Sequence, residues 1–365
     1  MNILFYSSFN SRARDAETLM IAFKKQGHRV LSLTQAEGKN INDVLFHAGI
    51  DARSYITKSK NKIGNVLQHT LYLIRLCKKE NIDIIYCHLE PASFIGILSQ
   101  YFIKAKVYLC RHHIDEALLY NFSKSITYRL TYRLAKKIIV VSEKAKKFMI
   151  ETEGVAASKI IHINLAYDFT LFNKPNAENV AELKKKFSAD ILLLTVGRLT
   201  QFKRPQLSID VLKMISQRGI DAKLIILGNG EMFEPLKQAI RYDNLEHKVF
   251  FTGHVQNVLD YMAASTFLLH PSILESSCVV VKEAGLIGLP AIVCQGVGDF
   301  DEYLVNGENG FLANHDNFVS DAVNVIQMCI NDGANLKKIT TKLNQDIIRI
   351  FSVDKIIDSY KSLNA

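Results

Sequence analysis

The feature that most constrains the fold is a repeated alternation of short apolar runs with amphipathic stretches. In the first half the apolar runs lie at residues 3–6, 30–33, 82–87, 106–110, 138–141 and 160–163. Runs of this length without polar alternation are typical of strands buried on both faces of a parallel sheet. Amphipathic stretches at 16–26, 66–79 and 91–102 predict helices between them. The pattern therefore predicts a doubly wound α/β domain.

The same alternation restarts after a polar stretch at 168–179, which we interpret as a linker. The later apolar runs lie at 191–196, 223–227, 249–251, 267–270 and 291–293, and the helical stretches at 205–218, 233–242, 279–287 and 318–330. A chain of 365 residues exceeds the size at which a single core stops growing. We therefore predict two Rossmann-like doubly wound domains, over 1–172 and 180–350.

The composition favours a globular protein in a reducing compartment. Hydrophobic residues make up 48% of the chain and charged residues 22%, unlike a disordered sequence. The six cysteines are scattered and never form C-x-x-C, so we expect neither a disulfide framework nor a zinc site. The N-terminus lacks a basic signal region, and the apolar stretch at 94–103 is too short to span a bilayer. We expect a cytoplasmic protein.

Charge is distributed unevenly between the halves. Residues 1–180 hold 26 Lys and Arg against 15 Asp and Glu, whereas residues 181–365 hold 19 against 21. The basic clusters comprise Lys58, Lys60 and Lys62, and then Lys124 through Lys147. Such a half can meet nucleic acid, an anionic lipid surface or a phosphorylated ligand, and a merely solvated surface is equally compatible. Aromatics do not interleave with the cluster at 58–62, so we expect no nucleic-acid partner.

The segment 270–290, HPSILESSCVVVKEAGLIGLP, places two glutamates eight residues apart. Glu275 falls in the loop after a strand and Glu283 on the next helix, with Ser276 or Ser277 available as N-cap. The helix start offers free N–H groups and a positive dipole end for a phosphate. Eight residues rise at most about 12 Å, so the carboxylates could hold both ends of a sugar nucleotide. A charged helix rim is the alternative.

Two cations occupy the loop after the first strand of the second half. In TVGRLTQFKRP, Arg198 follows Gly197, and Lys203 lies five residues further on, just before a helical stretch. Cations at the carboxyl end of a parallel strand can clamp a diphosphate, because ligands bind at that edge. A solvated loop is the alternative.

Taken in order, these motifs resemble family 4 glycosyltransferases. The resemblance rests on Gly197-Arg198 with Lys203, LGNGE at 227–231, FTGHV at 251–255, the two glutamates, and NGENGFL at 306–312. VVSEKAKKFM at 140–149 and FSVDKIIDSY at 351–360 agree more loosely. The resemblance implies the GT-B fold, in which two Rossmann-like domains face a cleft. It places the acceptor on the N-terminal domain and implies that a closing helix at about 351–365 packs back on that domain. It also implies a retaining transferase that moves a sugar from a UDP- or GDP-sugar to a glycan or lipid-linked acceptor.

The resemblance assigns roles to individual residues. Arg198 and Lys203 would bind the donor diphosphate, Glu283 the ribose and Glu275 the transferred sugar. The remaining predicted nucleotide-binding positions are Gly197, Gly253, His254, Val255, Ser276, Ser277, Cys278 and Val279. RHHIDE at 111–116 follows a strand where the family often has a histidine facing the donor sugar, so His112 or His113 is a further candidate. The chain departs from the family at 276–278, which is usually Gly-Phe-Pro, and at 7–14, which lacks glycine.

We expect catalysis without a metal or other cofactor. Cations and a helix N-terminus would stabilise the leaving diphosphate. Asp299-Phe300-Asp301 matches the D-x-D metal motif of another transferase fold, but it lies in a glycine-rich loop without nearby histidines. The resemblance implies same-face attack in which the leaving phosphate itself accepts the acceptor proton, and no nucleophile stands out in the sequence.

Two other enzyme classes remain as alternatives. A nicotinamide oxidoreductase is suggested by Gly228-Asn229-Gly230, but Phe233 stands where the dinucleotide fingerprint needs its third glycine. A sugar-nucleotide epimerase would share the two-domain architecture and need no acceptor. For a transferase, a phosphate-bearing lipid acceptor would draw the basic half to the inner face of the cell membrane.

Overall fold

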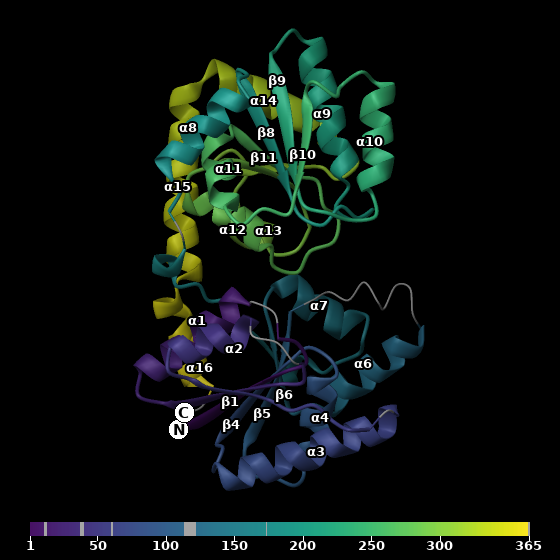
Figure 1. Ribbon diagram of the computed structural model, residues 1–365, viewed down its shortest axis with the longest axis vertical. Coiled ribbons are helices and arrows are strands. Elements are labelled where there is room, and N and C mark those ends of the chain that lie inside the picture. The colour runs from purple at the N-terminus through teal and green to yellow at the C-terminus, as the bar shows by residue number, and fades with distance from the viewer. Residues whose placement is uncertain (11–12, 37–39, 60, 113–121, 173, 364–365) are drawn as a thin grey trace. The chain divides into compact units, whose positions relative to one another are not determined.

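The computed structural model describes residues 1–365 apart from 11–12, 37–39, 60, 113–121, 173 and 364–365. The chain divides into two compact units, each described here by itself. The N-terminal unit comprises Met1–Asp168 with Phe351–Ala365, and the C-terminal unit comprises Phe169–Ile350. Each unit is an α/β domain built on a parallel sheet with helices on both faces, as the alternation predicts (Figure 1).

The N-terminal unit has a seven-stranded sheet in the order β3-β2-β1-β4-β5-β6-β7. The strands are β1 (Asn2–Ser7), β2 (Arg29–Thr34), β3 (Asp51–Ser54), β4 (Ile84–His88), β5 (Lys106–Arg111), β6 (Lys137–Val140) and β7 (Ile160–His162). The order reverses between β1 and β4, where Ser7 lies opposite His88. Our sequence pattern missed β3, because this edge strand is short, polar and not buried.

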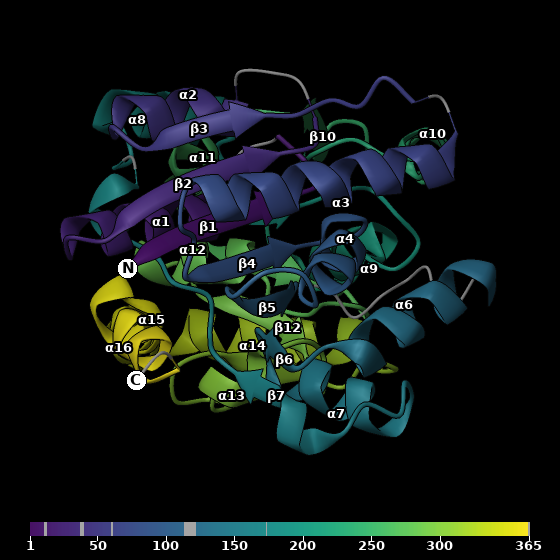
Figure 2. The same cartoon turned by 90° about the horizontal axis from the view of Figure 1, so that it is seen from below.

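Two helical layers cover this sheet (Figures 1 and 2). One layer consists of α1 (Arg14–Lys25), α2 (Asn40–His47) and α16 (Val353–Ser362), and its core includes Phe23 and Tyr360. The other consists of α3 (Lys62–Lys79), α4 (Ala92–Ser99), α6 (Phe122–Leu134) and α7 (Glu143–Glu151), with Leu73 and Ile95 in its core. A 3₁₀ turn, Ala157–Lys159, precedes β7.

The terminal helix α16 belongs to the N-terminal unit. Its Tyr360 ring meets Phe23 of α1 edge-on, with centroids 6.0 Å apart. The backbone N–H of Tyr167 donates to the carbonyl of Phe351 at 2.8 Å, which fixes the start of the returning segment. The chain ends are therefore held by one core.

The C-terminal unit has a six-stranded sheet in the order β10-β9-β8-β11-β12-β13. The strands are β8 (Ile191–Val196), β9 (Ala222–Leu227), β10 (Val249–Gly253), β11 (Phe267–His270), β12 (Ala291–Cys294) and β13 (Phe311–Ala313). The order reverses between β8 and β11, and ligands of doubly wound sheets bind beyond the carboxyl ends of the strands at such a point. The sequence pattern missed the three-residue strand β13.

Eight helices and one 3₁₀ turn complete the described part of this unit. They are Phe169–Leu171 (3₁₀), α8 (Ala177–Lys186), α9 (Pro205–Gln217), α10 (Phe233–Tyr242), α11 (Val258–Ala264), α12 (Val279–Leu286), α13 (Phe300–Tyr303), α14 (Phe318–Asn331) and α15 (Gly333–Phe351). A side chain at Gly285 would place Cβ 2.8 Å from Ile347, so α12 and α15 approach closely there.

None of the helices formed by the described residues combines the length and the hydrophobicity that crossing a bilayer requires.

Candidate active site

Loops at the carboxyl edge of the C-terminal sheet are joined backbone to backbone. Gly228 donates its N–H to the carbonyl of Gly253 at 2.8 Å, and Leu199 donates to Asn229 at 2.9 Å. A Cβ at Gly228 would lie 2.0 Å from the Gly197 carbonyl oxygen, and one at Gly230 would lie 2.4 Å from that of Leu199. The glycines of LGNGE are therefore required because the loop after β9 packs directly on the loop after β8.

Arg204 anchors the loop that carries the two predicted cations. It precedes Pro205 of α9 in a left-handed conformation, φ 47°. Its guanidinium donates to the carbonyls of Pro271 at 2.8 Å and His315 at 2.9 Å, and contacts Cys294 Sγ at 3.2 Å. One side chain thus ties the loops after β8, β11 and β13, and it fixes the backbone next to Lys203.

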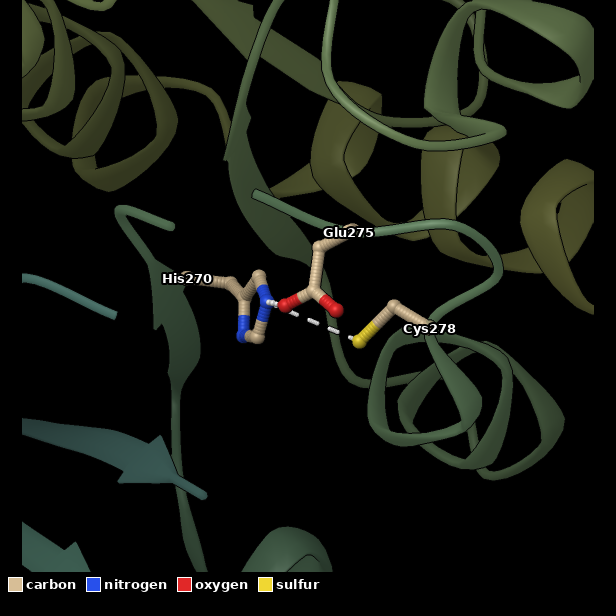
Figure 3. Close-up of side chains that lie close together, drawn as sticks. All are labelled: His270, Glu275 and Cys278. Carbon is tan, nitrogen blue, oxygen red and sulfur yellow. Dashed lines mark hydrogen bonds and ion pairs between the residues drawn. The ribbon is translucent and has the colours of Figure 1, made fainter. Parts of the chain in front are cut away.

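Lys203, Glu275 and His270 form a chain of charged contacts. The Lys203 ammonium pairs with the Glu275 carboxylate. His270 Nε2 lies 2.6 Å from Glu275 Oε1 and 3.5 Å from Cys278 Sγ (Figure 3). The Glu275 side chain is 10% exposed and that of His270 is 4% exposed. The structure therefore brings together two predicted residues, Lys203 and Glu275, which we had assigned to different parts of the donor.

The contacts of this cluster shift the pKa values of its carboxyl and imidazole groups. Burial by itself would raise the pKa of Glu275, but His270 and Lys203 lower it to about 2. Burial would likewise lower the pKa of His270, but Cys278 and Glu275 raise it to about 9. Near neutral pH the cluster is one carboxylate between an ammonium and an imidazolium. Lys203 and His270 thus place two cationic groups beside one carboxylate, an arrangement that suits an anionic ligand.

The same side chains include three metal-ligand types. Atoms of His270, Glu275 and Cys278 lie within 4.8 Å of one another and could hold a metal ion. Lys203 already donates to the Glu275 carboxylate, and an imidazolium cannot ligate a metal. A metal would therefore have to displace Lys203 and deprotonate His270.

The start of α12 differs from our prediction of a serine cap. Cys278 occupies the N-cap position and makes no side-chain cap hydrogen bond. Ser277 Oγ instead donates to Asp299 Oδ2 at 2.6 Å. The prediction of Ser276 or Ser277 as N-cap was wrong, because a partner distant in sequence binds the Ser277 hydroxyl.

That partner belongs to a buried ion pair which the sequence did not indicate. Lys282 Nζ lies 2.6 Å from Asp299 Oδ2, and the two side chains are 2% and 1% exposed. Lys282 also donates to Ser277 Oγ at 2.9 Å. Asp301, the other carboxylate of D-x-D, accepts the Gly296 N–H at 2.6 Å. Both aspartates thus organise the loop after β12.

The other predicted site residues lie along the same edge. Gly197 and Gly253 have positive φ values, 150° and 70°, which favour glycine. Arg198 and His254 are exposed, and Glu283 is half-buried on α12. Half-buried positions also include Val255, Ser276, Ser277 and Val279. All of them come from the end of β10, from the loops after β8, β10 and β11, and from α12.

NGENGFL has a structural explanation. Buried Asn309 donates to the Tyr303 carbonyl and to Asp346 Oδ2 of α15, both at 2.8 Å. Its Oδ1 accepts the Val305 N–H at 2.7 Å. The motif therefore joins the turn before β13 to α15.

A surface hollow of this unit lies at the opposite, amino-terminal edge of the sheet. Its lining includes Asp190, Thr266 and Pro290, which directly precede β8, β11 and β12. Because doubly wound sheets bind ligands at their carboxyl edge, we do not assign the active site there.

The N-terminal unit presents a histidine pair at its own carboxyl edge. His112 Nε2 lies 2.8 Å from His88 Nδ1, and His112 Nδ1 lies 3.5 Å from Asp15 Oδ2 of α1. Burial, with His112 as a neighbour, holds the pKa of His88 well below its usual range. Among the described residues His88 Nε2 has no hydrogen-bond partner. His113 lies outside the described residues.

His88 and Asp15 were missed at the sequence level. His88 directly follows the apolar run at 82–87, and a polar residue at the end of a predicted parallel strand is the signal that could have found it. Asp15 had no comparable signal, because only the packing of α1 brings it to the edge.

Comparison with known proteins places both halves of the chain. The profile described as Glycosyltransferase Family 4 matches residues 13–170, and that of Glycosyl transferases group 1 matches residues 177–345. The chain is 23% identical over 299 residues to N-acetyl-alpha-D-glucosaminyl L-malate synthase of Bacillus anthracis, covering 80% of this chain and 76% of that protein.

A second relative is UDP-Gal:alpha-D-GlcNAc-diphosphoundecaprenol alpha-1,3-galactosyltransferase of Escherichia coli, 25% identical over 319 residues, with 81% of this chain and 79% of that protein covered. Among solved structures, Anabaena HepE in complex with UDP superposes with a TM-score of 0.85 at 20% identity, covering 100% of this chain and 99% of that one. These neighbours have the GT-B fold. The chain is therefore a glycosyltransferase of the family 4 type.

Proposed function

We propose that this enzyme transfers a sugar from a UDP-sugar to a glycan or lipid-linked acceptor. The name of the Escherichia coli relative contains both UDP-Gal and a diphosphoundecaprenol acceptor. Anabaena HepE has been solved with UDP and with UDP-glucose. Uridine is therefore favoured over guanosine as the base.

The observation that carries the proposal is the cationic edge at the β8/β11 switch point. Lys203 and the His270 imidazolium flank one carboxylate, and Arg198 is exposed on the same loop as Lys203. A nucleoside diphosphate gains negative charge as it leaves, and cations held in place before the reaction stabilise that charge. We assign Arg198 and Lys203 to the diphosphate, with Lys203 shared between it and Glu275.

Glu275 would hold the transferred sugar. A carboxylate with a pKa of about 2 is ionised at neutral pH and can only accept hydrogen bonds. Sugar hydroxyls are donors that suit it. Glu275 therefore positions the sugar and does not act as the acid that protonates a leaving group.

The mechanism we propose is retaining and metal-independent. Arg198, Lys203 and the N-terminus of α12 replace a divalent cation at the leaving diphosphate. The departing phosphate accepts the proton of the attacking hydroxyl on the same face of the sugar. His112, bonded to His88, is proposed to contact the donor sugar.

The epimerase alternative has no support from the relatives and structures named above. The two reactions differ in their products, since a transferase releases UDP only when an acceptor is glycosylated and an epimerase returns a sugar nucleotide.

We also propose a cytoplasmic location, with the acceptor on the N-terminal unit.

The division of roles between the two glutamates is testable. Glu283→Ala should weaken UDP binding, because Glu283 is assigned to the ribose, whereas Glu275→Ala should spare UDP affinity and damage transfer. Calorimetry with UDP measures the first effect, and a UDP-release assay with panels of UDP-sugars and of glycan and lipid-linked acceptors measures the second. Glu246→Ala, an exposed acid on the loop before β10, is the control. Equal losses of UDP affinity in both variants would contradict the assignment.

A further inference from the structure

The outer face of α3 carries a stripe of exposed apolar side chains. Ile63, Leu67 and Leu71 are 84%, 57% and 44% exposed. Their spacing of four residues puts them on one side of the helix. The opposite side holds Leu73 and Leu76, which are buried against the sheet. The helix is therefore apolar both toward the core and toward solvent.

Neighbouring elements of the same layer also expose large apolar side chains. α3 packs on α4, and α4 packs on α6, in the same layer over one face of the sheet (Figure 2). Tyr101 and Phe102, just after α4, are 65% and 63% exposed, and Leu130 and Leu134 of α6 are 51% and 44% exposed. In the layer on the other face, Phe46 of α2 is the one exposed large apolar side chain among the described residues. The apolar surface thus belongs to one layer.

Three helices of the same layer, α3, α4 and α6, contain no aspartate or glutamate. The stretches 62–79, 92–104 and 122–137 contain ten lysines and arginines and no aspartate or glutamate. On the other face, the described helix α1 includes Asp15 and Glu17, and α16 includes Asp354 and Asp358. The basic charge of the N-terminal half is therefore concentrated where the apolar side chains are exposed.

We propose that this layer, which we call the α3 face, docks on the surface of an anionic lipid bilayer. Exposed apolar side chains enter the interface between headgroups and acyl chains, and lysines and arginines around them attract anionic headgroups. A surface that only faces water would be expected to carry few exposed apolar side chains, because exposed apolar patches promote association between molecules. The proposal rests on the proposed function in one respect, since a lipid-linked acceptor would be met at that surface.

The structure also sorts the basic residues singled out from the sequence. Lys146 and Lys147 of α7 lie 3.1 Å and 3.9 Å from carboxylates of the same helix, those of Glu143 and Glu151. Their charge is partly balanced. Lys62 at the start of α3, and Arg75 and Lys78 near its end, have no acid on their helix. We therefore assign the main attraction to α3 and not to α7.

The experiment uses the full chain and co-sedimentation with vesicles. One set contains phosphatidylcholine alone and the other phosphatidylcholine mixed with phosphatidylglycerol. We expect binding to the anionic set at low salt, and its weakening toward about 1 M salt, where the Debye length is about 3 Å. Binding that ignores vesicle charge would overturn the proposal.

Two variants separate the apolar and ionic contributions. Ile63→Ser with Leu67→Ser and Leu71→Ser should weaken vesicle binding at least about tenfold, because three inserted side chains are lost. Arg75→Gln with Lys78→Gln and Lys79→Gln should weaken it about a hundredfold, at roughly fivefold per basic residue. The matched control removes three exposed apolar side chains elsewhere: Phe46→Ser, Tyr242→Ser and Met328→Ser.

The readouts distinguish this inference from the proposed function. UDP-sugar turnover with a detergent-dispersed lipid acceptor should be unchanged in both α3 variants, because none of the substituted residues is assigned to the donor site. Normal turnover with undiminished vesicle binding in the variants would overturn the α3 face and leave the transferase proposal standing. Loss of vesicle binding in the control equal to that in the α3 variants would also overturn it. Absence of UDP-sugar turnover in the unaltered chain would defeat the proposed function, while specific vesicle binding would still support the α3 face.

Discussion

The two units share one architecture but present different chemistry at their carboxyl edges. The C-terminal edge holds a charged cluster, with Lys203 and the His270 imidazolium around the Glu275 carboxylate. The N-terminal edge holds a buried His88 whose pKa is well below its usual range, bonded to His112. Each of the two parallel sheets offers a position for ligand binding at its carboxyl edge. The charge of the side chains differs between the two edges, and we propose that the C-terminal edge therefore binds a diphosphate and the N-terminal edge neutral hydroxyl groups.

Each unit also contains a buried ion pair, and the two pairs allow the comparison to be tested. Arg111 and Glu153 lie 2.9 Å apart with exposures of 4% and 0%, and Lys282 and Asp299 lie 2.6 Å apart. The second pair supports the active-site loop, because a Cβ at Gly298, next to Asp299, would lie 2.8 Å from Glu275 Cβ.

The largest expected effect is on stability. Lys282→Ala and Arg111→Ala should each cost about 3–5 kcal/mol, because each removes the cation of a buried ion pair. Only Lys282→Ala should also weaken UDP binding. Urea denaturation measures the free energy of unfolding, and calorimetry measures UDP affinity. Arg241→Ala is the control, because the side chains of its ion pair with Glu246 are 61% and 58% exposed and the pair contributes at most about 1 kcal/mol. UDP affinity reduced equally by both buried variants would erase the distinction between the units.

The next effect concerns turnover. Arg198→Ala or Lys203→Ala should lower turnover at least about a hundredfold, or about 2.7 kcal/mol, because a charge contact to the leaving diphosphate is lost. Steady-state UDP release measures this, with circular dichroism to check that the fold is intact. Near-normal turnover in both variants would remove the diphosphate clamp.

A smaller effect should appear in the pH dependence of stability. The pKa of His270 is raised to about 9, so its contribution is complete below about 6.5 and is lost as the pH rises through 9. The pKa of Glu275 is lowered to about 2, so its contribution is complete above about 4.5 and is lost as the pH falls through 2. The pair therefore stabilises the unit most between about pH 4.5 and 6.5.

His270→Gln tests this dependence. Melting temperatures of the unaltered chain and the variant should differ most below pH 6.5 and converge toward pH 9. His247→Gln, which changes an exposed histidine of the same unit, should run parallel to the unaltered chain. Parallel curves for His270→Gln as well would show that the imidazolium does not stabilise the fold.

The smallest expected effect is that of a chelator. Turnover should be unchanged by excess EDTA, because Lys203 occupies the carboxylate that a metal at His270, Glu275 and Cys278 would need. The assay is UDP release with EDTA and then with added zinc or manganese. Loss with EDTA and rescue by zinc would assign that cluster to a metal, whereas rescue by manganese would point to Asp299 and Asp301.

Much of the architecture follows from local sequence. Strands β8 and β11 and helix α10 have the predicted bounds, because each is an uninterrupted apolar or amphipathic run with clear ends. Short or polar elements such as β3 and β13 carry too few apolar residues for periodicity to reveal them. The order of the motifs along the chain also indicated the family by resemblance. Their common position at the carboxyl edge was predictable as well, since loops after parallel strands gather at one edge whatever their sequence separation.

Only the tertiary structure decided which side chains meet. Lys203 and Glu275 are 72 residues apart, and Lys282 and Asp299 come from different elements, so no spacing along the chain indicates either pair. The same holds for Ser277, which the sequence offers as a helix cap and the fold gives to Asp299. The exposure of Leu67 was also decided by the tertiary structure. The amphipathic pattern of α3 predicts which face of the helix is buried, but it does not predict whether a neighbouring element covers the opposite face. Sequence determines periodicity through local backbone preference, whereas contacts and exposure depend on packing between distant segments.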